Sequence, residues 1–187
     1  MLSQEIKKLI FKIARQTIQS RFDSNIKLMD CPPDPVFNES FGIFVTLTKH
    51  GNLRGCIGYV KPYKPLYHSL IDLSFAAAFN DNRFNPLQKE EFKDLSIEIS
   101  LLSPLIQVES IEEIVVGRDG LLIDHPWGSG LLLPQVATKY NWTKEEFLKQ
   151  TCHKACLDED CWQKHNTKIY RFEAEIFSED DHCEDIL

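Results

Sequence analysis

The sequence lacks any hydrophobic run long enough to cross a bilayer, which argues against a membrane protein. In residues 2–22 the apolar side chains are spaced between charged ones, where a secretory signal peptide needs an unbroken apolar stretch. Internal repeats, low-complexity tracts and obvious linkers are also missing. With 43% hydrophobic and 26% charged residues the composition is that of a globular domain, and we expect a cytoplasmic protein.

Positive charge is scarce. The 21 Lys and Arg residues are outnumbered by 28 Asp and Glu residues, which gives a formal net charge of -7. The densest basic spots, at Lys7-Lys8 and within residues 61–64, are small. Binding to a phosphate backbone depends on such charge, so we expect no nucleic-acid partner. A phosphate loop is also missing, because Gly128-Ser-Gly130 lacks both the strand-to-helix setting and the lysine.

The chain contains six cysteines, at Cys31, Cys56, Cys152, Cys156, Cys161 and Cys183. Without an export signal the default compartment is reducing, so we expect free thiols. The run Cys152-x3-Cys156-x4-Cys161-x3-His165 suggests a metal site, but structural zinc normally uses tighter cysteine pairs. We therefore predict that this group binds no metal. The residues identify no cofactor.

Hydrophobic periodicity predicts both helices and strands. The helices are expected over residues 3–22, 66–79 and 143–157, with a shorter one from Pro86 to about Phe92. Strands are expected over residues 41–48, 53–59, 95–101 and 168–177, and Asp119-Gly120 is a hairpin signal within residues 115–123. Hairpins and packed helices without a repeating βαβ order predict an α+β fold, with antiparallel sheets covered by the helices.

The densest chemistry lies in Leu53-Arg-Gly-Cys-Ile-Gly-Tyr59. On a strand, Arg54 and Cys56 share a face, and a guanidinium beside a thiol favours the nucleophilic thiolate. Gly55 and Gly58 remove side chains, so that backbone or ligand can approach closely. The alternative is a small inert cysteine in a core strand, which is common in proteins.

Asp81-x-Arg83 follows the helix expected at residues 66–79. An acid and a base two residues apart in a turn can bind or orient a substrate. They can also simply pair with each other and close the turn, which is frequent at protein surfaces. Both interpretations stay open from the residues alone.

Four motifs stand out when they are taken together: Gly42-x-Phe-Val-Thr-Leu47, Leu53-Arg-Gly-Cys-Ile-Gly58, Asp81-x-Arg-Phe84 and Leu133-Pro-Gln-Val136. In combination they resemble the AMMECR family, over about residues 41–177. The resemblance implies a single AMMECR-like domain over residues 1–187, with the helix at 3–22 packed on it. It further implies two lobes, with Arg54, Cys56, Asp81 and Arg83 near a cleft between them and Gln135 as a further binding residue.

Members of this family are encoded beside Memo-like and radical-SAM proteins, which implies a shared pathway. One departure concerns Cys156, since the family is expected to show Lys-Ala-Gly where this chain has Lys-Ala-Cys. From these observations we expect an enzyme or enzyme component that uses Cys56 on a small molecule or on a partner's group. The alternative is a non-catalytic adaptor that binds a Memo-like or radical-SAM partner through the same cleft.

Overall fold

The computed structural model describes residues 1–182, which form two compact units. Unit 1 comprises Met1–Leu101 and the segment from Glu175 onward, and unit 2 comprises Leu102–Ala174. Each unit has its own four-stranded sheet, with strand order β2-β1-β3-β8 in unit 1 and β4-β7-β5-β6 in unit 2. The predicted α+β class is confirmed. The predicted cleft is not tested, because the structure describes each unit by itself.

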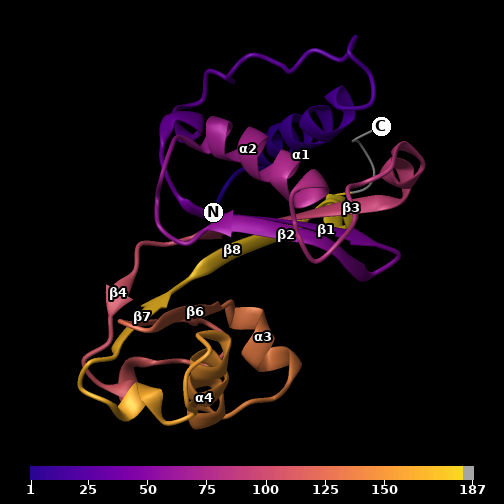
Figure 1. The fold of residues 1–187 in the computed structure, drawn as a ribbon. Coiled ribbons are helices and arrows are strands. Elements are labelled where there is room, and N and C mark those ends of the chain that lie inside the picture. Colours follow the sequence, from indigo (N-terminus) through magenta and orange to yellow (C-terminus); the bar gives the residue numbers. More distant parts are fainter. Residues whose placement is uncertain (183–187) are drawn as a thin grey trace. The chain divides into compact units, whose positions relative to one another are not determined.

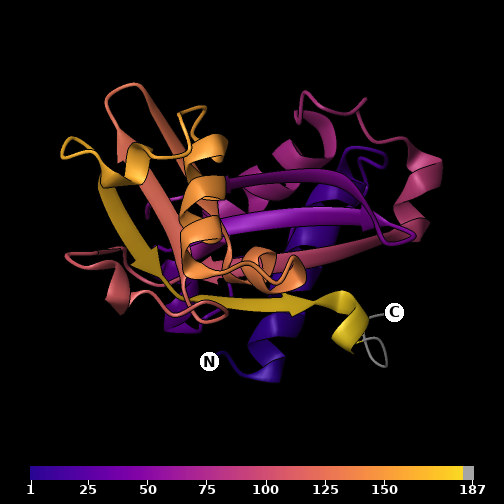
Figure 2. The ribbon, with the colours of Figure 1, turned by 90° about the horizontal axis from the view of Figure 1, so that it is seen from below.

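In unit 1, two helices lie over one face of the sheet (Figure 1). The turned view of Figure 2 shows the four strands of this sheet side by side. The helices are α1 (Gln4–Ser20) and α2 (Leu66–Phe79), and the strands are β1 (Gly42–Lys49), β2 (Asn52–Tyr59), β3 (Leu95–Leu102) and β8 (Ala174–Ser178). The bounds of α2 agree with the prediction, and α1 starts at the predicted cap, where Ser3 Oγ accepts the Ile6 N–H.

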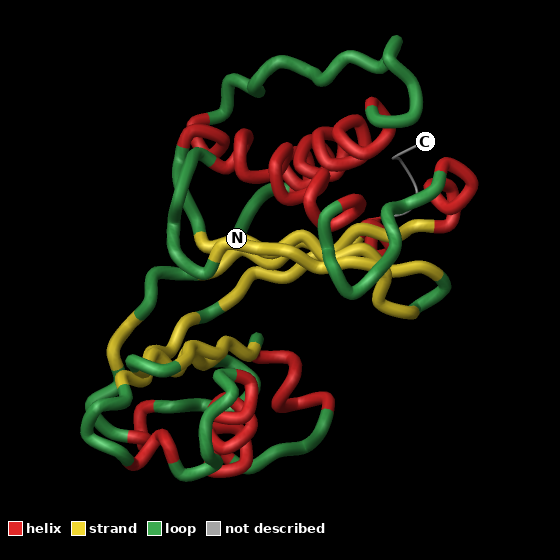
Figure 3. The backbone as a smooth tube through the Cα atoms, in the orientation of Figure 1, coloured by secondary structure: helices red, strands yellow, loops and turns green. Residues whose placement is uncertain are grey.

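The core of unit 1 forms between these helices and the inward face of the strands. Alternating residues of β1 are fully buried, at Ile43, Val45 and Leu47. The chain between α1 and β1 is mostly loop (Figure 3), and only the turn η1 (Pro35–Asn38) is helical there. The consecutive prolines before it account for that extended connection.

In unit 2, helix α4 (Lys144–Lys154) packs against β5 (Gly120–His125) and β6 (Gly128–Leu132). The remaining elements are β4 (Ile106–Gln107), β7 (Lys168–Phe172), α3 (Pro134–Lys139) and the turns η3 (Ile111–Glu113) and η4 (Cys161–Gln163). The predicted capping box of α4 is confirmed: Thr143 Oγ1 accepts the Glu146 N–H, and the Glu146 carboxylate accepts the Thr143 N–H. None of the described helices is long and apolar enough to cross a membrane.

Two predicted elements near the centre of the chain are wrong. No helix begins at Pro86, because residues 85–88 carry no regular structure and the 3-10 turn η2 (Lys89–Asp94) starts later. The hairpin signal at Asp119-Gly120 also fails, since the Asp119 carboxylate accepts the Val115 N–H and closes a turn instead. The hairpin lies further on, where His125 pairs with Gly128 around Pro126-Trp127.

The predicted strand over residues 168–177 is interrupted. Its two halves, β7 and β8, belong to different sheets. At the interruption, Glu173 N–H donates to Ser103 Oγ and the Glu173 carbonyl accepts the Ser103 N–H. Alternation continues through such a break, so the pattern of apolar residues did not mark it. The last turn of unit 1, η5 (Glu179–His182), follows β8.

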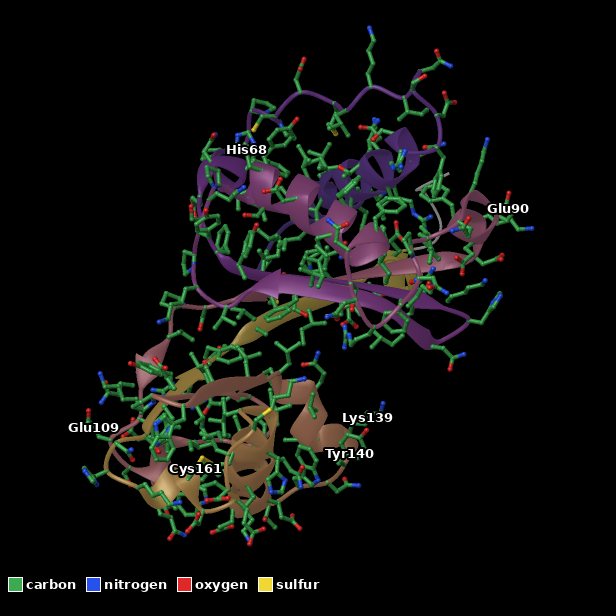
Figure 4. The ribbon with its side chains drawn as sticks, viewed as in Figure 1. His68, Glu90, Glu109, Lys139, Tyr140 and Cys161 are labelled. Carbon is green, nitrogen blue, oxygen red and sulfur yellow. A yellow bond between two sulfur atoms is a disulfide. The ribbon has the colours of Figure 1, made fainter. Side chains whose placement is uncertain are left out.

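The expectation of free thiols is wrong for two cysteines. Cys152 and Cys161 form a disulfide, with their Cα atoms 6.0 Å apart. Both side chains are buried in the core of unit 2, where Cys161 is labelled in Figure 4. The turn after α4 brings the chain back onto the helix face that carries Cys152, so burial places the two sulfur atoms together. Cys183 lies outside the described residues.

Candidate functional site

Cys56 lies in β2, at the edge of the unit 1 sheet. Its neighbour across the strand pair is Thr46 of β1. The Thr46 hydroxyl donates a hydrogen bond to Cys56 Sγ at 3.3 Å. The thiol is free and only partly buried. Cys56 is therefore not an ordinary core residue, because its sulfur atom has a polar partner and remains in part accessible.

The N–H and C=O groups of Cys56 face the open edge of the sheet, and the side chains of Asp81 and Arg83 form hydrogen bonds with them there. Asp81 Oδ2 accepts the Cys56 N–H at 2.9 Å, and Arg83 Nη2 donates to the Cys56 carbonyl at 3.1 Å. An edge strand otherwise leaves both groups unpaired. The acid and the base thus replace a neighbouring strand at this one residue.

Asp81 and Arg83 also bind each other. Arg83 Nε donates to Asp81 Oδ1 at 2.9 Å and Nη2 donates to Oδ2 at 2.6 Å. The Asp81 side chain is 3% exposed and that of Arg83 is 49% exposed. Hydrogen bonding from Arg83, assisted by the Cys56 N–H, holds the pKa of Asp81 well below its usual range despite burial. The hydrogen bond to Asp81 raises the pKa of Arg83, and Coulomb attraction to Asp81 and Cys56 adds to it.

Arg54 has a carboxylate partner of its own. Its Nε and Nη2 donate to Glu91 Oε1 and Oε2 at 3.1 and 2.9 Å, and Nη2 also donates to the Asn85 carbonyl at 2.9 Å. Lys49 Nζ lies 3.1 Å from Glu91 Oε1. The Arg54 hydrogen bonds, helped by those of Gln88 N–H and Lys49, lower the pKa of Glu91 to about 2.

Phe84 connects the two arginines. The guanidinium carbon of Arg54 lies 5.9 Å from the centre of the Phe84 ring, and that of Arg83 lies 5.5 Å from it. Both are at cation–π distance. The structure therefore brings four of the predicted site residues, Arg54, Cys56, Asp81 and Arg83, into one connected group around Phe84.

The two glycines of the site are approached closely by the protein itself. A Cβ on Gly55 would lie 2.0 Å from the Ala77 carbonyl oxygen of α2. A Cβ on Gly58 would lie 2.3 Å from the Phe44 ring. These contacts let β2 pack directly on α2 and let Phe44 cross the strand. A role of either glycine in binding a ligand stays a prediction.

The last predicted binding residue, Gln135, lies on α3 of unit 2, whereas the Cys56 group belongs to unit 1. Its Oε1 atom is buried and has no hydrogen-bond partner among the described residues. The cysteine run at Cys152, Cys156 and Cys161, which we predicted to bind no metal, also lies in unit 2. No cluster of three or more His, Cys, Asp or Glu side chains suited to a metal ion occurs among residues 1–182.

Sequence reasoning missed two residues of the site, Thr46 and Glu91. Thr46 lies within one of the recognised motifs, but its contact with Cys56 depends on the register of the hairpin. Glu91 lies in η2, where the predicted helix was misplaced. A search for an acid able to pair with Arg54 would have found several candidates of equal merit nearby.

Comparison with known proteins decides the family. The AMMECR1 family model matches residues 11–177. The chain belongs to the AMMECR1 family. A protein of Methanothermobacter thermautotrophicus is 48% identical, covering 96% of this chain and 97% of its own length. Protein TK0174 of Thermococcus kodakarensis is 42% identical, with 96% and 93% covered.

The fold of this AMMECR1-family chain also matches a solved structure. The crystal structure of the uncharacterized protein PH0010 from Pyrococcus horikoshii superposes with a TM-score of 0.81 at 39% sequence identity. The match covers 91% of this chain and 89% of that one. The predicted membership is thus confirmed, while the names of these relatives describe no activity.

Proposed function

We propose that this AMMECR1-family chain is an enzyme, or a component of one, that uses Cys56 as a thiolate nucleophile. The observation that carries the proposal is the way in which the hydrogen bonds of Cys56 are divided between its main chain and its side chain. Its N–H and C=O are both held by the Asp81–Arg83 pair, while its side chain remains a free thiol bonded by Thr46. A residue fixed at its main chain and left reactive at its side chain is preorganised for attack.

The residues have distinct roles in this proposal. Arg83 is assigned to the negative charge that develops on Sγ, because its guanidinium is held 3.1 Å from the Cys56 carbonyl. The Thr46 hydroxyl donates to the same sulfur and orients it. Asp81 positions Arg83 and the Cys56 main chain. Arg54, the predicted activator, is held by Glu91, and its role in this proposal is that of an anion clamp instead.

The chemical step is a nucleophilic displacement, in which Cys56 Sγ replaces a leaving group on an electrophilic atom of the substrate. The thiol first loses its proton to water, and the Sγ electron pair then forms a bond to an electrophilic atom of a small molecule or of a partner's group. The bond to the leaving group breaks, and its electron pair departs with that group. A second nucleophile then takes the transferred group from Sγ and restores the thiolate.

Mass spectrometry of the protein purified from its own cell tests this function. We expect a covalent adduct on the peptide that contains Cys56, or a retained small molecule that is lost in Cys56→Ser. The Cys31 peptide is the internal control, because that thiol is exposed. An unmodified Cys56 peptide, together with full biological activity of Cys56→Ser, would contradict the proposal.

A second candidate is an adaptor that binds a Memo-like or radical-SAM partner through the same residues. The half-exposed guanidinium of Arg83 and the exposed side chain of Leu53, 45% exposed on β2, favour it because both can contact a protein surface. Binding of such a partner that survives Cys56→Ser and is lost in Leu53→Asp supports the adaptor. Partner binding that is lost in Cys56→Ser but kept in Leu53→Asp supports the enzyme.

A further inference from the structure

The two arginines around Phe84 use their donors in the same way. A guanidinium has five N–H donors. In each arginine Nε and Nη2 bind a carboxylate, and the second Nη2 donor binds a main-chain carbonyl, that of Cys56 for Arg83 and that of Asn85 for Arg54. Among the residues that the structure describes, neither Nη1 group makes a hydrogen bond. Each arginine is therefore held rigidly with two donors unused.

In the Asp81–Arg83 pair the negative charge is buried and the positive charge is half-exposed, whereas the side chains of Arg54 and Glu91 are both largely buried, at 14% and 19% exposed. The Asp81 carboxylate is 3% exposed, whereas the guanidinium that covers it belongs to a side chain 49% exposed. Counting Lys49, three cations face the two carboxylates of Asp81 and Glu91. The cluster carries a net positive charge in a chain whose formal charge is -7.

Such a patch has a chemical consequence beside a nucleophile. Arg83 donates to the Cys56 carbonyl at 3.1 Å, so its guanidinium is held against the main chain of the residue that carries the thiol. The ring of Phe84, near both guanidinium carbons, fixes the two cations on one side chain. Arginine held in place in this manner suits planar or tetrahedral oxyanions, because little side-chain freedom is lost on binding.

We propose that the Nη1 groups of Arg83 and Arg54 form an anion site that selects substrates of Cys56 bearing a carboxylate or a phosphoryl group. This inference rests on the proposed function, since it names the substrate class for the same thiol. It adds the specificity determinant: the anionic group binds the arginines, and the electrophilic atom is presented to Sγ.

Two alkylating agents of the same reactivity type test it on the intact chain. Iodoacetate carries the carboxylate that iodoacetamide lacks, and both release iodide when the thiolate attacks their methylene carbon. We expect the rate ratio of iodoacetate to iodoacetamide at Cys56 to exceed that at exposed Cys31 by about tenfold at low salt, as for one well-placed charge pair. Because both agents react with the same sulfur atom, a change in its general reactivity cancels from the ratio.

Variants locate the effect. Arg83→Met and Arg54→Met should each lower the ratio at Cys56 towards that of Cys31. Arg118→Met is the matched control, since Arg118 is a similarly exposed arginine paired with a buried aspartate in unit 2, and it should leave the ratio unchanged. Acetate and inorganic phosphate are then added as competitors. The anion that slows the reaction of iodoacetate with Cys56 more strongly is the one that fits the site better.

If a variant fails to fold, the salt dependence of the rate ratio in the wild-type chain tests the same proposal. Added salt should remove most of the excess ratio at Cys56, because the exposed part of Arg83 is screened. A Cys56 that reacts fast with iodoacetamide but shows the same ratio as Cys31 overturns the anion site and leaves the nucleophile proposal standing. A Cys56 that reacts slowly with both agents overturns the proposed function itself.

Discussion

Each unit contains a buried aspartate paired with a half-exposed arginine, and the two pairs are used differently. In Asp81–Arg83 the side chains are 3% and 49% exposed, and in Asp119–Arg118 they are 0% and 45% exposed. Both arginines bind the two carboxylate oxygens through Nε and Nη2. The difference lies in the main-chain group that the carboxylate also accepts.

In unit 2 the main-chain N–H that the Asp119 carboxylate accepts is close in sequence. The carboxylate binds the Val115 N–H four residues away and closes a turn. In unit 1, Asp81 also accepts a local N–H, that of Arg83, but in addition it accepts the Cys56 N–H, 25 residues away in another element. An ion pair is therefore no sign of function by itself, and the two pairs differ in what they hold: a local turn in unit 2, and the main chain of the free cysteine Cys56 in unit 1.

The cysteines repeat the contrast. The unit 2 pair Cys152–Cys161 is buried and covalently closed, which serves the fold. Cys56 of unit 1 is a free thiol that accepts a hydrogen bond from Thr46, and we propose that it serves chemistry. The predictions below test whether this division holds.

The largest expected effect comes from neutralising the two aspartates. Asp81→Asn and Asp119→Asn should each lower the free energy of unfolding by about 3 kcal/mol, because a buried charged acceptor is lost. Only Asp81→Asn should also slow alkylation of Cys56. Urea unfolding and peptide-resolved alkylation of both variants measure the two effects. If Asp119→Asn slows Cys56 equally, the contrast between the pairs is lost.

Opening the disulfide should have the next largest effect. Cys152→Ala with Cys161→Ala should lower the free energy of unfolding by about 2.5 kcal/mol, since a loop with a sequence separation of 9 is no longer closed in the unfolded chain. Cys31→Ala, at an exposed thiol, is the control and should change stability by less than about 0.5 kcal/mol. The alkylation rate of Cys56 should stay at the wild-type value, and any large change there argues against separate roles.

Acid should weaken unit 1 through Glu91. The folded pKa of about 2 lies below the ordinary value of 4.5, so the stabilisation is complete above pH 4.5 and is lost as pH falls towards 2. Between these values the free energy of unfolding should fall with acid more steeply in the wild type than in Glu91→Gln. The difference in slope reaches up to about 1.4 kcal/mol per pH unit. Parallel curves for the two proteins would refute the paired state of Glu91.

The smallest effect concerns the end of α4. Cys156 has φ 59°, and it forms the left-handed position of a Schellman turn in which its N–H donates to His153 and the Leu157 N–H donates to Cys152. Glycine is preferred there, so Cys156→Gly should stabilise the chain by about 1 kcal/mol. Asn141→Gly, at φ 53°, is the control and should gain less, because asparagine tolerates this region. Thermal unfolding should show a rise of about 2–4 °C for Cys156→Gly alone.

Local patterns in the sequence were sufficient for the starts of α1, α2 and α4, but not for the helix expected at Pro86, which is absent, or for α3, which no pattern predicted. The apolar face and flanking prolines determined α2 to the residue, and the caps Ser3 and Thr143 determined the starts of α1 and α4. The glycine expected in place of Cys156 from the family resemblance has a structural reason in its left-handed backbone. Each of these features depends on residues within one or two helical turns.

The site depended on features that no local pattern encodes. A bulge between Leu47 and Thr48 shifts the register, so that Thr46 faces Cys56. With a regular two-residue turn at His50-Gly51, Val45 would be expected opposite Cys56. The pairing of Arg54 with Glu91 joins residues 37 apart in sequence, and the hydrogen bond of Asp81 to the Cys56 N–H joins residues 25 apart.

The most direct test of the account is the iodoacetamide rate of Cys56 measured beside those of Cys31 and Cys156 at neutral pH. Exposure alone ranks Cys56 last of the three, because it is partly buried and the other two are exposed. The account predicts that Cys56 nevertheless reacts fastest of the three, because the neighbouring Arg83 guanidinium and Thr46 hydroxyl favour attack by its sulfur atom. A Cys56 that reacts no faster than Cys31 would contradict the activated thiolate and leave the adaptor as the better explanation of this site.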